Sequence, residues 1–450
     1  MFQLKMSAVK VPHHKNTAAC VSKTIDPPEE VLLPLKTSKH RVGSNIPLVQ
    51  VGDHVYVGQK IAEENGRGTA PMHASVSGTV TSIDADVWTT GGIGEAICIR
   101  SDGKMEKDPS LRPPVVTNLD EFQDALRSSG IVGLGGAGYP LWAKLDAIRK
   151  GPIETVLING AECEPFITSD HRTMLERTED IAKGIEMLRT FIGSKKFIFG
   201  VESNKPDAIA HLKERFANVE GVEVKTLESV YPQGAKQVFL YNSTGIIVQK
   251  GERLAKYKVI ITNVSTLAAM GRFFIDGMPL VERTITLDGS AVNEPANVTV
   301  PVGTSIRWVV EHCGGLKCDP AKIIIGGPMM GKTVGSLDAP IVKVTNAVLL
   351  FDEKDAVLPE ESPCIHCGRC VEACPLNLNP TAFSKAMELD DDDERAAILR
   401  KEQVAVCMSC GSCSFVCPAH RPLADTNTKA KGFLKKYDAD HSDKEGGGRK

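Results

Sequence analysis

The sequence predicts a multidomain protein of the α/β and α+β classes. The first hundred residues alternate β-branched and polar side chains between glycine turns, which indicates a small β domain. Strand and helix patterns alternate over residues 118–280, as is typical of an α/β domain with a largely parallel sheet. Two cysteine runs of identical spacing mark a further domain. The predicted boundaries are 1–112, 118–280, 281–350, 355–430 and a tail at 431–450.

Composition limits the class of protein. Apolar residues make up 42% of the 450 positions and charged residues 24%, both ordinary for a globular protein. The net charge of −3 gives no basic field for nucleic acid, so we expect no nucleic-acid partner. The N-terminal MFQLKMSAVKVPHHK has no apolar core, so it is not a signal peptide, and no apolar run approaches the length of a membrane span. We therefore expect contact with a membrane only through partner proteins.

The N-terminal domain is predicted from two β patterns. Val49–Val57 and Ser75–Ile83 are expected strands, and glycine turns accompany both. Together they resemble the two halves of a lipoyl- or biotinyl-type barrel, but the modified lysine is absent. We expect a structural role, followed by a linker at Arg100–Asp108 and Pro113-Pro114.

The α/β domain at 118–280 is predicted from alternating elements. The expected helices are Leu119–Ser129, capped by Asn118, then Arg172–Leu188, capped by Asp170, and Pro206–Phe216. The expected strands are Thr155–Ile158, Lys196–Gly200 and Val222–Thr226.

The remaining residues are predicted as a β-rich domain, a cysteine-rich domain and a tail. Thr284–Leu287, Ala296–Val302 and Ile323–Ile325 are expected strands, and Ile306–His312 is an expected helix. The last twenty residues are rich in lysine, aspartate and glycine, so we expect disorder at 431–450.

The two cysteine runs predict iron–sulfur centres. Each has the spacing C-x2-C-x2-C-x3-C followed by proline, which is the ligand pattern of a two-cluster bacterial ferredoxin. In that pattern the fourth cysteine of each run serves the other cluster. One predicted [4Fe–4S] centre therefore takes Cys364, Cys367, Cys370 and Cys417, and the other takes Cys407, Cys410, Cys413 and Cys374. Zinc is the alternative, since C-x2-C pairs also build zinc sites.

A glycine-rich segment, GIVGLGGAGYP at 130–140, is a candidate phosphate-binding loop. The backbone amides at Gly133, Gly135, Gly136 and Gly138 can approach a phosphate closely. The segment lacks the G-K-[ST] of a Walker loop and does not follow a first strand, so it is not a dinucleotide fingerprint. A purely structural tight turn is the alternative.

Polar residues near this loop favour a ligand site. Tyr139 follows the glycines directly, and Lys144 lies five residues further on. The strand at 155–158 ends in Asn159, and Glu162 and Glu164 come next, where parallel sheets bind ligands. An asparagine amide can bind a heterocycle edge, a lysine can pair with a phosphate, and the carboxylates suit a ribose or nicotinamide.

These motifs carry a family resemblance. "GLGGAGYP", Lys144 and "NGAECEP" resemble the FMN and NADH site of the flavoprotein subunit of respiratory complex I. More closely, "GIVGLGGAGYPLWAKL", "INGAECEPFITSDHRTMLE", "NKPDAI", "YPQGA", "GGPMMG", "SPCIHCGRC" and "CGSCSFVCPAHRPL" resemble the C subunit of the Rnf complex. The resemblance spans residues 30–425 and is weakest before residue 30. It implies a barrel-sandwich-like N-terminal domain, a flavin domain, a ubiquitin-like SLBB domain at 281–350 and a helical two-cluster ferredoxin-like domain.

The resemblance also implies roles for individual residues. Gly133, Gly135, Gly136, Gly138 and Lys144 would hold FMN. Asn159 and Glu164 would line the flavin and nicotinamide, and Tyr139 would stack on NADH. "TNVSTLAA" resembles an asparagine-rich flavin loop, which adds Asn263, Ser265 and Thr266. Ala161 departs from complex I, where an acidic residue stands.

The implied function is electron transfer between NADH and ferredoxin through FMN and two [4Fe–4S] clusters, coupled to ion translocation by the whole complex. The expected partners are other Rnf subunits, especially the iron–sulfur B subunit, with ferredoxin reached indirectly. The expected location is peripheral, on the cytoplasmic face of the cell membrane. One alternative is a cobalamin reductase of the propanediol-utilisation type, which the extra β domain disfavours. Another is a cluster-bearing scaffold that has lost its flavin.

Overall fold

The computed structural model describes residues 8–36, 44–66, 68–89, 92–146, 149, 151–249, 252 and 254–445. The chain divides into two compact units, which are described separately. The larger unit comprises His13–Glu228 and Arg253–Ala356. The smaller unit comprises Met1–Pro12, Ser229–Glu252 and Val357–Lys450.

A β domain forms the first part of the larger unit. One sheet has the order β2-β8-β7-β4 and a second has the order β3-β5-β6. The strands are β2 (Glu30–Pro34), β3 (Ile46–Pro47), β4 (His54–Val55), β5 (Lys60–Glu63), β6 (Met72–His73), β7 (Gly78–Thr89) and β8 (Gly92–Ser101). Val31, Val55, Ile61 and Ile97 lie among the buried residues of its core.

Two strand predictions in this domain were wrong in extent. The expected strand Val49–Val57 is broken by a turn at Val51-Gly52, where Gly52 adopts a φ of +97°, and only β4 remains. The expected strand Ser75–Ile83 begins later, at Gly78, and continues to Thr89. A Cβ at Gly78 would collide with the carbonyl of Arg100 on β8, so a glycine is required where this strand starts.

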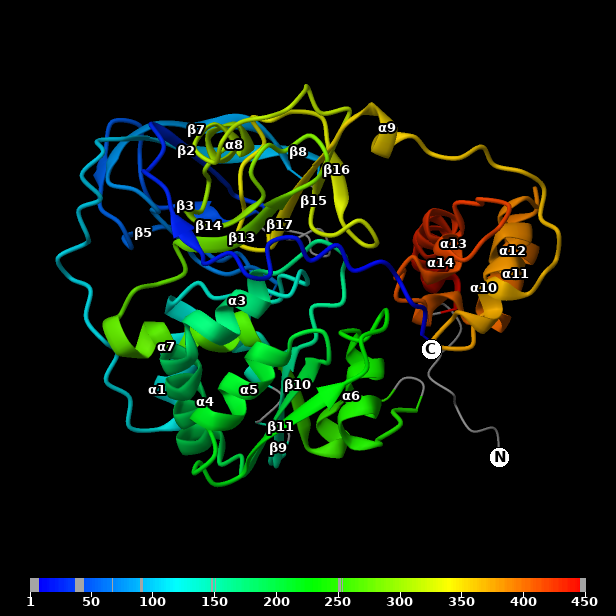
Figure 1. The fold of residues 1–450 in the computed structure, drawn as a ribbon, viewed down its shortest axis with the longest axis horizontal. Helices are drawn as coiled ribbons and strands as arrows, with labels where there is room; N and C mark the ends of the chain where they lie inside the picture. Colours follow the sequence, from blue (N-terminus) through cyan, green and yellow to red (C-terminus); the bar gives the residue numbers. More distant parts are fainter. Residues whose placement is uncertain are drawn as a thin grey trace. The chain divides into compact units, whose positions relative to one another are not determined.

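The α/β domain contains a four-stranded, fully parallel sheet in the order β11-β10-β9-β12. The strands are β9 (Thr155–Gly160), β10 (Lys196–Glu202), β11 (Val222–Leu227) and β12 (Val259–Asn263). Figure 1 shows helices beside this sheet, namely α1 (Leu119–Ser128), α4 (Thr178–Ile192), α5 (Pro206–Arg215) and α7 (Val264–Asp276). The Asn118 side chain accepts a hydrogen bond from the Glu121 amide, so the predicted cap of α1 is confirmed.

The expected single helix Arg172–Leu188 is two helices. α3 (Ser169–Glu176) ends at Arg177, whose φ of −123° and ψ of 32° are not helical, and α4 begins at the next residue. The break lets α4 lie very close to α7: a Cβ on Gly184 would be only 2.6 Å from the Leu267 carbonyl. The prediction that Asp170 caps the helix was also wrong, because Thr168 is the N-cap and Asp170 lies in the first turn.

The β-rich region at 281–350 forms a six-stranded mixed sheet in the order β1-β14-β13-β17-β15-β16. Its strands are β13 (Glu282–Asp288), β14 (Ala296–Pro301), β15 (Lys322–Ile325), β16 (Lys332–Val334) and β17 (Ala347–Phe351), with α8 (Ile306–Glu311) and α9 (Glu353–Ala356). The first strand, β1 (Lys23–Thr24), pairs in parallel with β14. Residues 23–24 therefore belong to this sheet, although they fall inside the predicted N-terminal domain.

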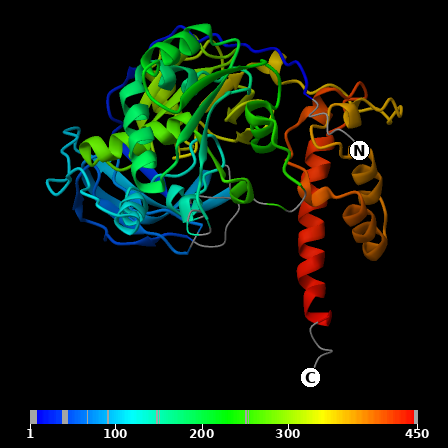
Figure 2. The ribbon, with the colours of Figure 1, turned by 90° about the horizontal axis from the view of Figure 1, so that it is seen from below.

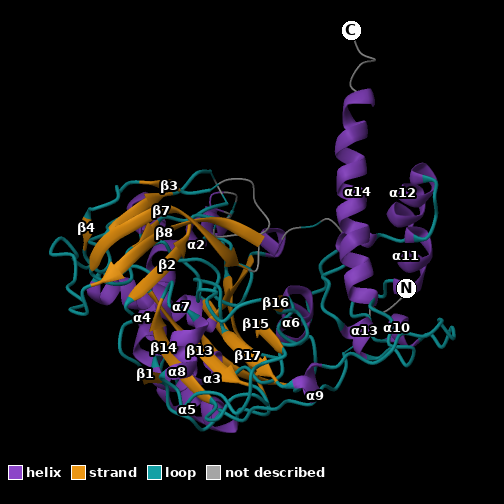
Figure 3. Cartoon of the chain, turned by 90° about the horizontal axis from the view of Figure 1, so that it is seen from above, coloured by secondary structure: helices purple, strands orange, loops and turns teal. Residues whose placement is uncertain are grey.

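The smaller unit is helical. It contains α6 (Lys236–Thr244), α10 (Arg369–Glu372), α11 (Pro380–Met387), α12 (Asp392–Lys401), α13 (Ser412–Phe415) and α14 (Leu423–Glu445), with a 3-10 turn at Val404–Val406. In the larger unit, the short α2 (Leu141–Leu145) and a 3-10 turn at Leu254–Tyr257 complete the described helices. Figure 2 shows α14, in red, as one long helix, and Figure 3 shows it beside α11 and α12.

The predicted disorder at 431–450 was wrong for residues 431–445, which continue α14, while residues 446–450 lie outside the described residues. Hydrophobic contacts explain the order, because Leu434 is buried in a cluster with Phe383 and Leu399, and Phe433 and Tyr437 pack against it. Composition alone does not reveal this, since the apolar residues are few but fall on one helical face. Among the described helices, none is long and apolar enough to cross a membrane.

Candidate flavin and iron–sulfur sites

The sheet of the α/β domain has its switch point between β9 and β12. Successive strands β9, β10 and β11 extend in one direction, and β12 returns to the other side of β9. In such sheets, ligands bind beyond the carboxyl ends of the strands at this point. Asn159 of β9 and Asn263 of β12 are direct register partners there. A Cβ on Gly135 would lie 3.3 Å from the Asn263 side chain, so the glycine loop reaches the same edge.

The glycine loop is closed on itself by backbone hydrogen bonds. The Gly133 amide donates to the Tyr139 carbonyl at 2.8 Å, and the Gly138 amide donates to the Gly133 carbonyl at 3.0 Å. Gly135 and Gly136 are exposed, and Gly136 has a φ of +96° with open space where a Cβ would stand. A loop with two exposed glycines in succession at the switch point fits the phosphate end of a flavin nucleotide.

The three residues expected on an asparagine-rich loop lie in regular structure instead. Asn263 ends β12 and caps α7, and Ser265 and Thr266 lie in the first turn of that helix. The Asn263 Nδ2 donates to Asp170 Oδ2 at 2.7 Å, and the Ser265 hydroxyl donates to Asp170 Oδ1 at 2.5 Å. The Thr266 hydroxyl accepts from the Leu134 amide at 2.9 Å. These side chains thus hold the glycine loop and α3 in place.

Asp170 is the centre of this support. Burial raises the pKa of its carboxyl, and hydrogen bonds from Ser265 and Asn263 lower it. Its own amide donates to Glu162 Oε1 at 2.6 Å, which links α3 to the loop after β9.

The remaining predicted flavin residues lie on the segments that follow the glycine loop and β9. Lys144 is half-buried on α2, and Tyr139 is half-buried against the domain core. Glu164 Oε2 accepts from the Met329 amide at 3.0 Å, and a Cβ on Gly327 would collide with this side chain. The GGPMMG turn therefore packs on the loop that carries Glu164.

Glu162 is buried and faces a lysine that sequence reasoning missed. Its Oε2 lies 4.0 Å from the Lys15 ammonium. Burial raises the pKa of Glu162 to about 7, although Lys15 and Lys205 lower it. Burial lowers the pKa of Lys15 to about 8, with Glu162 opposing that shift. Burial therefore disfavours the charged form of both groups, and the attraction between them favours it.

A second buried ion pair lies at the end of β10. The Lys205 ammonium donates to Glu202 Oε2 at 2.9 Å, to the Ala161 carbonyl at 3.0 Å and to Asn204 Oδ1 at 3.0 Å. Lys205 is 1% exposed and Glu202 is fully buried. Lys205 belongs to the "NKPDAI" motif, which was quoted for the family resemblance, but the sequence did not predict a role for this lysine. Lys15 had no sequence signal, because it lies where the family resemblance is weakest.

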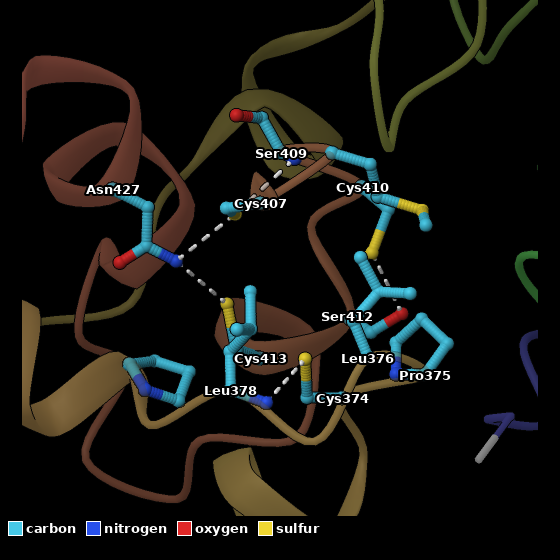
Figure 4. Close-up of a pocket in the computed structure, with 12 residues that line it drawn as sticks. Cys374, Pro375, Leu376, Leu378, Cys407, Ser409, Cys410, Ser412, Cys413 and Asn427 are labelled. Carbon is cyan, nitrogen blue, oxygen red and sulfur yellow. Dashed lines mark hydrogen bonds between the residues drawn. The ribbon is translucent and has the colours of Figure 1, made fainter. Parts of the chain in front are cut away.

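In the smaller unit, four cysteines line one pocket. They are Cys374 of the first run and Cys407, Cys410 and Cys413 of the second, the same four that were assigned to one centre. Figure 4 shows their side chains around this pocket. The Leu378 amide donates to Cys374 Sγ at 3.3 Å, and the Ser409 amide donates to Cys407 Sγ at 3.4 Å.

Further contacts fit this pocket to a negatively charged cluster. Asn427 Nδ2 of α14 lies 3.8 Å from Cys407 Sγ and 3.7 Å from Cys413 Sγ. Burial raises the pKa of the Cys413 thiol to about 12, so a thiolate there requires metal coordination. N–H donors directed at sulfur are among the features that set cluster potentials. Tyr231, of the "YPQGA" motif, donates to the Cys410 carbonyl at 2.6 Å and fixes the second run.

The other four cysteines are less enclosed. Cys370 is buried, Cys364 and Cys417 are half-buried, and Cys367 is exposed. Burial raises the pKa of Cys370, and the charges of Cys417 and Cys364 add to the shift. Cys417 packs against the apolar cluster that contains Cys370. Across the part of the chain that the structure describes, no three His, Cys, Asp or Glu side chains form a single-ion metal site.

Comparisons with known families agree with this architecture. Residues 6–104 match the RnfC barrel sandwich hybrid domain, and residues 126–272 match the Nuo51 FMN-binding domain. Residues 284–333 match the SLBB domain, and residues 363–421 match the 4Fe-4S dicluster domain. The predicted fold class, with its flavin, SLBB and two-cluster domains, is confirmed. The chain is thus a flavin-domain and iron–sulfur protein of the electron-transfer class.

Curated relatives specify the family. The chain is 38% identical to the C subunit of the Na+-translocating ferredoxin:NAD+ oxidoreductase complex of Acetobacterium woodii, over 78% of this chain and 80% of that one. It is 37% identical to the proton-translocating counterpart of Clostridium ljungdahlii, over 79% and 78%. The C subunit of an ion-translocating oxidoreductase complex of Pectobacterium carotovorum is 38% identical over 80% of this chain and 49% of that longer one. The chain belongs to this family of C subunits, and the predicted resemblance is confirmed.

A solved structure shares the fold at low identity. A chain of an NAD+-reducing [NiFe]-hydrogenase in the air-oxidised state aligns with a TM-score of 0.51 and 19% identity, over 70% of this chain and 63% of that one.

Proposed function

We propose that this chain is the NADH-oxidising member of a membrane-bound ferredoxin:NAD+ oxidoreductase that is coupled to ion translocation. The relatives from Acetobacterium woodii and Clostridium ljungdahlii are named as parts of such complexes and align over most of their length. The barrel domain at 6–104 belongs to the same family, which supports this function over that of a cobalamin reductase.

The flavin site of the proposal lies at the carboxyl ends of β9 and β12. Gly133, Gly135, Gly136 and Gly138 would bind the FMN phosphate through their amides, and Lys144 would add a positive charge. Asn159, Glu162, Glu164 and Tyr139 would face the flavin and the nicotinamide. Asn263, Ser265 and Thr266 support the loop through the hydrogen bonds described above. FMN, when bound, exchanges two electrons with a nicotinamide and single electrons with an iron–sulfur centre.

The cysteines would hold two [4Fe–4S] clusters. Cys374, Cys407, Cys410 and Cys413 would bind one cluster in the enclosed pocket. Cys364, Cys367, Cys370 and Cys417 would bind the other, next to exposed apolar side chains. The protein supplies positioning and electrostatics, and no side chain needs to act as an acid or base.

The proposed partners are the other subunits of the complex, in particular its iron–sulfur B subunit, with ferredoxin served through them. Ile365, 66% exposed, and Phe415, 47% exposed, lie next to cluster cysteines in the sequence and suit a protein contact. The chain would be peripheral, on the cytoplasmic face of the membrane.

One observation carries the flavin assignment: Gly135, Asn159 and Asn263, from three separate segments, meet at the switch point of the sheet. The test is anaerobic purification of the full chain and an absorption spectrum before and after NADH. The expected result is a flavin band and a broad cluster shoulder that NADH bleaches together. Cluster absorbance that NADH leaves unchanged, even with added FMN, would contradict the proposal and favour a scaffold.

A further inference from the structure

The loop that follows β9 has an ammonium group at its centre. Lys15 Nζ donates to the carbonyl oxygens of Glu162 at 2.8 Å, Glu164 at 2.9 Å and Ile167 at 2.5 Å. It also lies 4.0 Å from Glu162 Oε2. All three hydrogens of the ammonium are thus used within one short loop. The lysine comes from a segment about 150 positions earlier in the chain, as the separations of 147, 149 and 152 show.

This loop needs external donors because its backbone is irregular. Glu162 has a φ of 45° and Phe166 a φ of 70°, values that side-chain-bearing residues rarely adopt. Neither helix nor strand hydrogen bonds cover residues 161–167. Buried carbonyl oxygens must find donors elsewhere, and Lys15 and Lys205 provide them for residues 161, 162, 164 and 167.

Neighbours of Lys15 fix the same segment. The Phe166 amide donates to the His13 carbonyl at 2.9 Å, and the His14 ring stacks on the Phe166 ring with centroids 4.8 Å apart. Asn16 Nδ2 donates to Asp288 Oδ2 at 3.1 Å, and the Thr17 hydroxyl lies 2.5 Å from that of Thr168. The segment 13–17 is therefore attached on both sides of Lys15, so the ammonium position is fixed before any ligand binds.

We propose that Lys15 is a positioning residue of the flavin site, whose ammonium holds the loop 161–167, and with it Glu164, beside the switch point of the sheet. This inference rests on the proposed function and assigns a role to the N-terminal segment, which the motifs leave unexplained. The three carbonyls supply the hydrogen-bond acceptors that a desolvated ammonium requires, and the Glu162 carboxylate supplies the opposite charge. Lys205 supports the beginning of the same loop from the opposite side, through Ala161.

The test compares K15M with K10M in the full chain purified with its clusters. Methionine keeps the length of the side chain but removes the donors, and Lys10 is an exposed lysine of the same N-terminal segment. The flavin-free measurement is deuterium exchange of the amides of residues 161–167, which should be faster in K15M alone. Titration with FMN, followed by its fluorescence, should show affinity weakened by about tenfold in K15M, since the loop must then be ordered on binding.

Kinetics separate positioning from general damage. With NADH and ferricyanide, the KM for NADH should rise by about tenfold in K15M while kcat changes little, because the loop contributes binding that is equal in ground and transition states. K15R keeps charge and donors in a larger head group and should lie between K15M and the native chain. Iron content should stay the same in all three, since the clusters lie in the other unit.

The possible outcomes are distinct. If K15M and K10M have equal FMN affinity and equal KM for NADH, the inference about Lys15 is overturned and the proposed function stays intact. A native chain that binds clusters but no FMN would overturn both. If K15M does not fold, K15R against K10R makes the same comparison, and equal KM values would again reject the role of Lys15.

Discussion

The sulfur atoms of the cysteine pocket accept hydrogen bonds from residues that are near in sequence, and one longer-range bond joins Tyr231 to the Cys410 carbonyl. The loop after β9, by contrast, is held mainly by contacts with remote segments. The hydrogen bonds to Cys374 and Cys407 come from residues four and two positions away. The bonds to the loop span 147 to 165 positions, from Lys15 on one side and Met329 on the other. The first site is therefore defined by spacing, and the second exists only once the larger unit has folded.

The two regions also differ in what stabilises them. Lysine ammonium groups with carbonyl partners support the larger unit, namely those of Lys15, Lys205 and Lys343. In the pocket, buried thiols and apolar side chains surround a space that a cluster would fill. Whether a buried lysine carries its charge depends on pH, because burial disfavours the charged form. Whether the cysteines are ligated depends on the presence of iron. The larger unit should thus respond to pH and the smaller unit to loss of iron.

The largest expected effect is on the clusters. C413S should remove one of the two centres, and iron should fall from about eight to about four atoms per chain. Measurement of iron, acid-labile sulfide and the EPR spectrum of the reduced protein checks this. Cys318 is exposed and lies outside both runs, so C318S should keep all the iron.

The pairing of the runs can be tested in the same way. C374S should abolish the same EPR signal as C413S, because both cysteines line one pocket. If C374S instead removes the signal that C364S removes, the crossed assignment is wrong.

The second effect concerns α14, which is helical up to Glu445 although the sequence predicted disorder from residue 431. L434A should lower the free energy of local opening by about 2 kcal/mol, as expected for truncating a leucine that is 5% exposed. Deuterium exchange of the α14 amides measures this directly. K435A removes the exposed neighbour and should change that free energy by no more than about 0.5 kcal/mol. Fast exchange in the native chain would support the original prediction of disorder.

Sequence alone predicted the cluster cysteines and the parallel sheet because both depend on local spacing. The crossed set around Cys374 needed only the known pattern of two-cluster ferredoxins. The sheet followed from alternating strands and helices, although the break at Arg177, after which α4 packs closely on α7, was not predicted. Such packing involves residues far apart in the chain, so no local pattern could reveal it.

The candidate flavin site was predicted only in part. The glycines and Asn159 were predicted from motifs. Asn263, Ser265 and Thr266 were predicted as flavin contacts, which stays a prediction, and their hydrogen bonds to Asp170 and the Leu134 amide were not predicted. Lys15 was missed. A lysine in an irregular segment is most often exposed, and only the fold reveals that three carbonyls of a distant loop surround this one.

The third effect tests whether the glycine loop needs its open space. In G135V, the new side chain would meet Asn263, where even a Cβ would lie 3.3 Å away. FMN affinity should fall by at least about tenfold, with iron unchanged, since overpacking at such a contact costs about 1–3 kcal/mol. Gly335 has open space around it, so G335V is the matched control. Equal FMN affinity in the two variants would mean that the loop does not bind the nucleotide.

The smallest effect is a pH dependence at the junction between domains of the larger unit. The Lys343 ammonium is buried and donates to the Pro71 carbonyl at 2.7 Å and to the Gly130 carbonyl at 2.8 Å. Burial lowers the pKa of Lys343 to about 7. From pH 7 towards pH 10.5 the unfolded chain keeps this proton while the folded chain loses it, so stability rises with pH.

The contribution of Lys343 can be isolated by substitution. Between pH 7 and pH 8 the native chain should gain about 1 kcal/mol more stability than K343M, which lacks the titrating group. Trp88, Trp142 and Trp308 are the three tryptophans of the chain, and all belong to the larger unit, so their fluorescence during urea unfolding reports that unit alone. K332M, at an exposed position, should keep the native slope. If the unfolding free energy changes equally with pH in K343M and the native chain, the folded chain keeps the Lys343 ammonium charged over this range. The contacts of Lys343 would then stabilise its charge more than two carbonyls are expected to, as the contacts around Lys15 do.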